Sequence, residues 1–254
     1  MSAAIDRFLL DGRLVLVTGA SSGLGTHFAQ LLAGAGARVA LAARRTDKLQ
    51  SVVDAITQAG GQARAYSLDV TSAASVRECL DAIAAWGVPD VVVNNAGVTV
   101  TRPLLEQTEE DFDHVLDTNL KGCWLVATEA ARRMVAAGQG GAIVNVASIL
   151  GERVAGGVAP YAISKAAVVQ ATKAMALEWG RYGINVNALC PGYIDTEINH
   201  HHWQTEQGQK LVSMLPRKRV GQPQDLDALI VMLASDQSHF INGSVIAADD
   251  GFAL

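Results

Sequence analysis

Short runs of β-branched and aliphatic residues alternate with helix-period segments almost to the end of this 254-residue chain. Several of the runs are continuously apolar, which is typical of parallel strands that helices cover on both faces. Repeated strand–helix units predict an α/β fold in which a doubly wound, Rossmann-type parallel sheet lies between two layers of helices. The predicted strands are residues 14–17, 39–42, 63–67, 91–93, 143–146, 184–189 and 244–247.

Helical periodicity fills most of the intervals between these runs. We find no linker, low-complexity segment or break in composition, and we therefore expect residues 1–254 to form a single domain. The polar segment 195–216 fits neither a core strand nor a strongly amphipathic helix. We interpret it as a mobile lid over a binding site, with an ordinary surface insertion as the alternative. The predicted helices are residues 23–34, 47–59, 72–86, 109–137, the segment between strands 143–146 and 184–189, and 224–234.

The composition excludes several classes of protein. Half of the residues are hydrophobic and the net charge is −5, so no basic surface indicates a nucleic-acid partner. No apolar run approaches the roughly 18 residues of a membrane span, and charges interrupt the N-terminal segment, which favours a cytoplasmic protein. The three cysteines lack metal-ligand spacing, and the consecutive side chains of His200–His202 point in different directions on a helix, so we expect no metal site.

A glycine-rich turn follows the first predicted strand directly. Gly19, Gly23 and Gly25 are spaced Gly-x-x-x-Gly-x-Gly and lead into a helix. Glycines let backbone N–H groups approach a phosphate closely, and the N-terminus of a helix supplies free donors and a favourable dipole. Ligands of doubly wound sheets bind beyond the carboxyl ends of the strands. We therefore interpret this turn as a pyrophosphate cradle for a dinucleotide rather than as a plain tight connection.

The end of the second predicted strand indicates which dinucleotide binds. An acidic residue there would hydrogen-bond the adenosine ribose and repel a 2′-phosphate, but this chain has Ala43 followed by Arg44 and Arg45. Guanidinium groups form charge-assisted, bidentate hydrogen bonds with phosphates. The sequence therefore favours NADP(H) over NAD(H), chiefly through Arg44 with Arg45 in support. Two merely solvated arginines are the alternative.

Tyr161 and Lys165 are four residues apart, and Ser148 lies thirteen positions before the tyrosine. At that spacing the phenol and the ammonium group share one face of a helix, where the ammonium favours the charged phenolate. A serine hydroxyl can hold the oxygen that gains or loses the proton. The pair alone is a weak indication because a short motif also arises by chance. Together with the cradle, it predicts a proton-transfer site beside a nicotinamide.

With these residues assembled, the chain resembles the classical short-chain dehydrogenases/reductases over nearly its whole length, and is most similar to the members that resemble 3-oxoacyl-acyl-carrier-protein reductases. The resemblance implies a Rossmann-type fold of about seven strands and a homotetramer. The matching motifs, in the order of the family, are Thr18-Gly-x-x-x-Gly-x-Gly25, Asp69-Val70, Asn94-Asn95-Ala96-Gly97, Asn119, Ser148, Tyr161-x-x-x-Lys165 and Pro191-Gly192.

The resemblance also implies chemical roles. By position, Tyr161 is the general acid or base that exchanges a proton with the substrate oxygen, and Ser148 orients that oxygen. Lys165 binds the nicotinamide ribose, and Asn119 resembles the residue that holds a water in the proton relay behind the lysine. One position departs from the pattern, because NADP-preferring members often carry a basic residue where this chain has Ser22. The residues that match the cofactor site are Gly19, Ser21, Ser22, Gly23, Leu24, Gly25, Arg44, Arg45, Asp69, Val70, Asn95, Ala96, Gly97, Tyr161, Lys165, Pro191, Gly192, Ile194 and Thr196.

We expect an NADP(H)-dependent reductase of ketones or 3-oxoacyl thioesters that also oxidises secondary alcohols. A sugar or polyol dehydrogenase is the alternative within the same class. A protein that senses NADPH without turnover is a second class, but such members commonly lose the tyrosine or the lysine that this chain retains. A nucleotide-sugar epimerase or dehydratase usually needs a longer C-terminal domain. The substrate stays open, and the residues expected to select it, besides the lid, are Ile149, Leu150, Glu152 and Val154.

Overall fold

Seven strands form one sheet in the part of the chain that the computed structural model describes, residues 8–197 and 199–254. They are β1 (Leu14–Thr18), β2 (Arg38–Ala43), β3 (Gln62–Ser67), β4 (Val91–Asn94), β5 (Gly141–Val146), β6 (Ile184–Pro191) and β7 (Val245–Ala248). Their order is β3-β2-β1-β4-β5-β6-β7, and every neighbouring pair is parallel. The predicted Rossmann-type sheet is confirmed.

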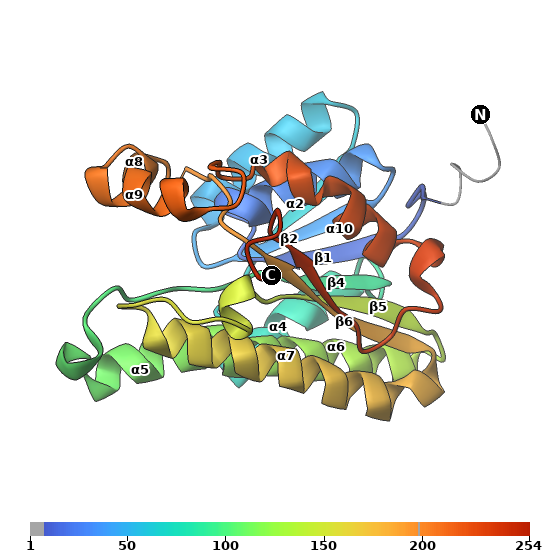
Figure 1. Cartoon of the computed structure of the whole chain (residues 1–254). Coiled ribbons are helices and arrows are strands. Elements are labelled where there is room, and N and C mark those ends of the chain that lie inside the picture. The colour runs from blue at the N-terminus through green and yellow to red at the C-terminus, as the bar shows by residue number, and fades with distance from the viewer. Residues whose placement is uncertain (1–7, 198) are drawn as a thin grey trace.

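Helices cover both faces of the sheet, which completes a single domain (Figure 1). Successive residues of a strand point to opposite faces, so Val15 and Val17 belong to one buried cluster, whereas Leu14 and Leu16 belong to another. The first cluster is closed by α2 (Gly23–Gly34), α3 (Thr46–Gln58) and α10 (Asp227–Ala234). The second is closed by α4 (Ala73–Ala84), α6 (Gly122–Ala136) and α7 (Ala159–Trp179).

The strand order reverses beside β1, which pairs with β2 on one side and with β4 on the other. Chain connections diverge at such a point, so the carboxyl ends of β1 and β4 open the crevice in which doubly wound sheets bind ligands. The predicted cradle begins directly after β1, and Asn95 directly follows β4. The fold therefore places both motifs at this crevice.

Two of the predicted helices are interrupted. The predicted helix 109–137 consists of α5 (Glu109–Leu116), a π-helical turn (Asp117–Lys121) and α6. The predicted helix 224–234 begins with a 3-10 turn, Pro223–Leu226, before α10 starts. Single π-helical turns inside helices are frequent at functional sites, and this one carries Asn119.

The segment 195–216 contains two helices, α8 (His200–Trp203) and α9 (Glu206–Met214). The sequence indicated no strongly amphipathic helix here, yet α9 forms, and the Thr205 hydroxyl caps it by accepting a hydrogen bond from Gly208 N at 3.1 Å. Both helices stand apart from the sheet, at the left of Figure 1. Ile198, within this segment, lies outside the described residues. None of the helices in the two described ranges is long and apolar enough to cross a membrane.

Candidate active site

The turn between β1 and α2 has the shape of a phosphate cradle. Gly19 and Gly23 adopt φ angles of 66° and 56°, a region that glycine occupies without strain. A Cβ atom at Gly25 would lie 2.3 Å from the carbonyl oxygen of Gly19, so a side chain has no room there. Ser22 precedes α2 in an extended conformation, and its side chain makes no capping hydrogen bond. The first N–H groups of α2 are therefore available to a phosphate.

The residues that follow β4 brace this cradle. The Thr18 hydroxyl accepts hydrogen bonds from the backbone N–H groups of Asn95 and Ala96, both at 3.1 Å. Asn95 Nδ2 donates to the carbonyl oxygen of Thr18 at 3.1 Å. A Cβ atom at Gly19 would be only 2.8 Å from Ala96 Cα, so the two turns touch. Asn95 and Ala96 thus border the cradle and hold its shape.

Arg45 reaches from the end of β2 to the cradle. Its Nη2 atom donates to the hydroxyl groups of Ser21 and Ser22, each at 3.0 Å. The guanidinium group is exposed, and a phosphate could therefore replace water around it. Ser22 is neutral, but the guanidinium group of Arg45 places a positive charge beside it.

Asp69 and Val70 follow β3. The Asp69 carboxylate accepts hydrogen bonds from the hydroxyl and the backbone N–H group of Thr71, at 2.8 and 3.0 Å. These two bonds lower the pKa of Asp69, burial opposes them, and the charge of Arg44 adds to the lowering. Val70 packs against α6 so closely that a Cβ atom at Gly122 would lie 2.7 Å from its side chain. The ionised carboxylate is therefore fixed near the end of β3.

The buried side chains of Asn119 and Lys165 come together beside Gly97, which is exposed. Asn119 Nδ2 donates to the carbonyl oxygen of Val98 at 2.9 Å and to Ser164 Oγ at 3.0 Å. Asn119 Oδ1 accepts from Val98 N at 2.7 Å. A Cβ atom at Gly97 would lie 3.3 Å from Asn119 Oδ1 and 3.6 Å from Lys165 Nζ. The amide oxygen and the ammonium group therefore border the same space beside Gly97.

Tyr161 and Lys165 lie in the first turns of α7. Lys165 is 4% exposed, its Nζ donates to the carbonyl oxygen of Val146 at 2.7 Å, and the same atom lies 5.6 Å from the centroid of the Tyr161 ring. Ser164 Oγ donates to the carbonyl oxygen of Tyr161 at 2.7 Å. Ser164 thereby connects the side chain of Asn119 to the backbone of the tyrosine. Sequence reasoning missed Ser164, and its available signal was a small polar residue directly before the lysine.

Ser148 lies two residues beyond β5, at the start of a 3-10 turn (Ile149–Gly151). Its side chain is nearly buried, and Oγ accepts a hydrogen bond from Leu150 N at 3.1 Å. A Cβ atom at Gly151 would be 2.9 Å from the carbonyl carbon of Lys165. The turn that carries Ser148 therefore packs directly on the part of α7 that carries the lysine.

The segment after β6 packs against the end of β7. A Cβ atom at Gly192 would lie 2.7 Å from Asp249 Cα, so glycine is required there. Ile194 is buried, and Asn199 Nδ2 donates to its carbonyl oxygen at 2.8 Å. Asn199 Oδ1 in turn accepts from the backbone N and the hydroxyl of Thr196, at 2.7 and 3.1 Å. These contacts fix the start of the segment 195–216.

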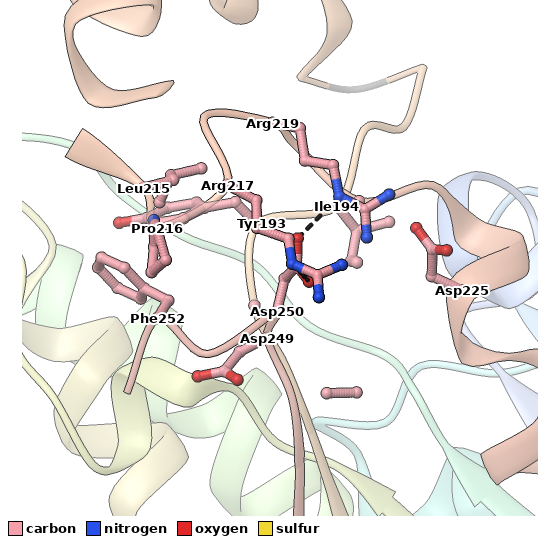
Figure 2. Close-up of a pocket in the computed structure, with 13 residues that line it drawn as sticks. Tyr193, Ile194, Leu215, Pro216, Arg217, Arg219, Asp225, Asp249, Asp250 and Phe252 are labelled. Atoms are coloured by element: carbon pink, nitrogen blue, oxygen red, sulfur yellow. Dashed lines mark hydrogen bonds and ion pairs between the residues drawn. The ribbon is translucent and has the colours of Figure 1, made fainter. Parts of the chain in front are cut away.

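A row of aromatic side chains beside this segment was also missed. The ring centroid of Tyr193 lies 5.7 Å from that of Trp203 in α8 and 5.4 Å from that of Phe252. Arg153 Cζ lies 5.1 Å from the centroid of Phe252. Tyr193 and Phe252 line a cavity of about 230 Å³ (Figure 2). Phe252 lies far along the chain from Tyr193 and Arg153, so no local pattern signalled its contacts with them.

Cys190 lies in β6, directly before Pro191, and is fully buried. Burial and, in second place, the charge of Glu152 raise the pKa of its thiol to about 11. Glu152 is itself exposed. A carboxylate thus stands within electrostatic reach of the end of β6, on the turn that follows Ser148.

The three consecutive histidines, His200–His202, belong to α8 and are exposed to solvent. His200 Nδ1 lies 2.9 Å from a carboxylate oxygen of Asp195. The ring of His202 meets that of Trp203 edge-on, with centroids 5.1 Å apart. Within the part of the chain that the structure describes, no three His, Cys, Asp or Glu residues gather in the way that a metal ion requires.

Known proteins are similar to this chain over nearly its whole length. The family model described as Enoyl-(Acyl carrier protein) reductase matches residues 19–253. D-threitol dehydrogenase of Mycolicibacterium smegmatis is 37% identical over 248 residues, which cover 97% of this chain and 95% of that protein. The 3-oxoacyl-(acyl-carrier-protein) reductase of Thermotoga maritima is 35% identical over 246 residues, 96% of this chain and 99% of that protein. Gluconate 5-dehydrogenase from Burkholderia cenocepacia, in a crystal structure with NADP and tartrate, is 37% identical, with a TM-score of 0.93 over 98% of each chain.

Proposed function

The chain belongs to the classical short-chain dehydrogenases/reductases, and from this premise we propose which reaction it performs and which residues perform it. It is an oxidoreductase that acts on CH–OH groups and uses a nicotinamide dinucleotide. We infer that it interconverts a secondary alcohol and a ketone, that it prefers NADP(H), and that Tyr161 exchanges the proton with the substrate.

The connected group of Asn119, Ser164, Tyr161 and Lys165 carries this proposal. A bound nicotinamide would supply or accept the hydride. Tyr161 protonates the substrate oxygen in reduction and deprotonates the hydroxyl in oxidation, while Ser148 holds that oxygen in place. The buried ammonium of Lys165 lies 5.6 Å from the centroid of the Tyr161 ring. General acid–base catalysis of this kind contributes roughly 10²–10⁴-fold in rate. A water in the space bordered by Asn119 Oδ1 and Lys165 Nζ would connect the ammonium to solvent.

We further propose that the cradle binds the pyrophosphate of NADP(H) and that Arg45 binds its 2′-phosphate. Support comes from the uncapped start of α2 and from the guanidinium group held at Ser21 and Ser22. Arg44, the adjacent cation, adds to the positive potential there. The other proposed contacts are Gly19, Gly23, Leu24, Gly25, Asp69, Val70, Asn95, Ala96, Gly97, Tyr161, Lys165, Pro191, Gly192, Ile194 and Thr196.

A small polyhydroxylated alcohol or its ketone is the substrate that we propose, and a 3-oxoacyl thioester is the competing candidate. Glu152 favours the first, because an exposed carboxylate beside Ser148 accepts hydrogen bonds from hydroxyl groups, whereas an acyl chain needs an apolar wall. Relatives named D-threitol dehydrogenase and gluconate 5-dehydrogenase support the same choice. Because one relative is named 3-oxoacyl-(acyl-carrier-protein) reductase, 3-oxoacyl thioesters must also be assayed as substrates.

We propose that the protein is a cytoplasmic homotetramer whose copies pair through helices. Phe112 of α5, Trp124 of α6 and Leu177 of α7 are exposed to 39%, 49% and 86%, and such side chains at a helix surface favour association. All three cysteines are free thiols, as in proteins of reducing compartments. Light scattering after size-exclusion chromatography would measure the mass, and a monomer would contradict the assembly.

Initial rates test the substrate proposal. Tetritols, hexitols and aldonates are assayed with NADP, and ketones and 3-oxoacyl thioesters with NADPH. We expect the highest kcat/KM for a polyhydroxylated substrate, and a loss on Glu152→Gln that is larger for it than for a simple ketone. A 3-oxoacyl thioester that reacts best and is indifferent to Glu152→Gln would contradict the proposal.

A further inference from the structure

The chain that follows β7 turns back over the carboxyl end of β6. Its turn is held by Asp249, whose carboxylate accepts hydrogen bonds from Gly251 N at 3.1 Å and Ala253 N at 2.7 Å. Gly192 N donates to the carbonyl oxygen of Ala248 at 2.9 Å. The C-terminal turn, residues 249–253, is thereby packed against the segment that leaves β6.

Phe252 lies between two elements of the proposed site. Its half-buried ring meets that of Tyr193 edge-on, with centroids 5.4 Å apart and planes at 61°. The guanidinium carbon of Arg153 stands 5.1 Å from the centroid of the Phe252 ring, and Arg153 Nη1 donates to the carbonyl oxygen of Phe252. One residue therefore contacts both the segment after Pro191 and the turn after Ser148.

Arg153 belongs to the turn that Ser148 begins. Its backbone N donates to the carbonyl oxygen of Ile149 at 2.9 Å, and Glu152 N donates to the same oxygen at 3.0 Å. Arg153 and Glu152 are thus consecutive residues anchored to the same carbonyl oxygen. On the other side, Tyr193 is one residue from Ile194 and contacts Trp203 of α8 across 5.7 Å.

We propose that Phe252 is a positioning residue, which sets the distance between the turn that carries Ser148 and Glu152 and the segment that carries Gly192 and Ile194. This inference rests on the proposed function, because the substrate would bind between these two elements. A misplacement of about 1 Å in such a site lowers the rate roughly 10²-fold. Phe252 itself acts through Arg153 and Tyr193.

A second anchor keeps the C-terminal turn in place when the ring of Phe252 is removed. The carboxylate of Asp250 pairs with Arg219 at 2.7 Å and with Arg217 at 3.4 Å. Figure 2 shows this group across the cavity from Phe252. Removal of the ring should therefore disturb the two contacts at Arg153 and Tyr193 without releasing the whole turn.

Kinetics of Phe252→Ala, Phe252→Tyr, Arg153→Met and the Phe252→Ala/Arg153→Met double variant test the proposal. We expect Phe252→Ala to lower kcat/KM for the alcohol about 10–100-fold, with the dissociation constant of NADPH little changed, and Phe252→Tyr to restore most of the loss. The double variant should lose much less than the product of the two single losses. Tyr182→Ala removes a similar contact, Arg181 over Tyr182 at 4.8 Å, near the start of β6 at the opposite edge of the sheet, and should leave kcat/KM unchanged.

Amide hydrogen exchange of the same variants, measured with bound NADPH, tests the role of Phe252 without relying on turnover. We expect faster exchange in residues 149–158 and 192–197 of Phe252→Ala, and not in Tyr182→Ala. Unchanged exchange in both segments, or independent losses in the double variant, would overturn the positioning role. A wild-type protein that turns over no alcohol or ketone would instead contradict the proposed function, while the exchange result would still decide the role of Phe252.

Discussion

Arg45 holds its guanidinium group 3.0 Å from the hydroxyl of Ser22, the residue directly before the middle glycine of the cradle. Family members that prefer NADP often carry a basic residue at that position, and this chain supplies the charge in space from the end of β2. A cation between the cradle and β2 would pair with the 2′-phosphate of NADP, as we propose, whereas the unmodified ribose of NAD offers it no anion.

Arg45→Ala should therefore raise the KM for NADP about 10–100-fold, because it removes charge-assisted hydrogen bonds to the phosphate. The KM for NAD should change little. Arg44→Ala is the matched control and should have the smaller effect, since Arg45 is the residue that contacts Ser21 and Ser22. Initial rates with both cofactors measure this, and an equal loss for NADP and NAD would show that the 2′-phosphate binds elsewhere.

Two glycines of α2 offer a matched pair of substitutions. A Cβ atom at Gly25 would lie 2.3 Å from the carbonyl oxygen of Gly19, whereas one at Gly34 would meet nothing within 4 Å. Gly25→Ala should therefore abolish NADPH binding or folding. Gly34→Ala should bind NADPH normally and raise the free energy of unfolding by up to about 1 kcal/mol, because alanine favours the helix. Fluorescence titration and thermal unfolding measure both, and tight NADPH binding by Gly25→Ala would contradict the proposed cradle.

The cysteines, of which Cys79 and Cys190 are buried and Cys123 is partly buried, should resist alkylation in the folded protein. Burial raises the thiol pKa of Cys190 to about 11 and those of Cys79 and Cys123 to about 12. The reactive thiolate is therefore scarce near pH 7.5 and increases about tenfold per pH unit below the pKa. Iodoacetamide labelling followed by mass spectrometry should show slow reaction that rises with pH, and full labelling only after unfolding. Rapid labelling of Cys190 at neutral pH would contradict this environment.

Residues 195–216 should become less accessible when the site is filled, as the lid interpretation requires. Brief proteolysis of the free protein should cut near α8 and α9, and NADP with a bound substrate should protect these bonds more than NADP alone. Equal cleavage in all three states would favour the alternative of a surface insertion.

Local patterns predicted the sheet because several of its strands are continuous apolar runs, as in Leu14–Thr18. They could not predict the break in the helix 109–137. The π-helical turn there accompanies hydrogen bonds of Asn119 to Val98 and Ser164, which lie 21 and 45 residues away. A π-helical turn that accompanies long-range contacts leaves no periodic signal of its own.

In the proposed site, too, residues with a local sequence signal could be predicted, whereas residues placed by long-range contacts could not. Tyr161 and Lys165 could be found from their spacing, because four residues on a helix make neighbours. Phe252 could not, because its partner Arg153 lies 99 residues away. The proposed cofactor preference lies between these cases. The sequence favoured Arg44 with Arg45 in support, whereas the contacts with Ser21 and Ser22 in the fold belong to Arg45.

The role of Tyr161 is tested most directly by Tyr161→Phe, assayed for turnover and for NADPH binding in the same preparation. The phenyl ring keeps the packing over Lys165 and loses the proton. The account predicts a fall in kcat of roughly 10²–10⁴-fold, with NADPH affinity and thermal stability close to wild type. Turnover close to that of the wild type would contradict it.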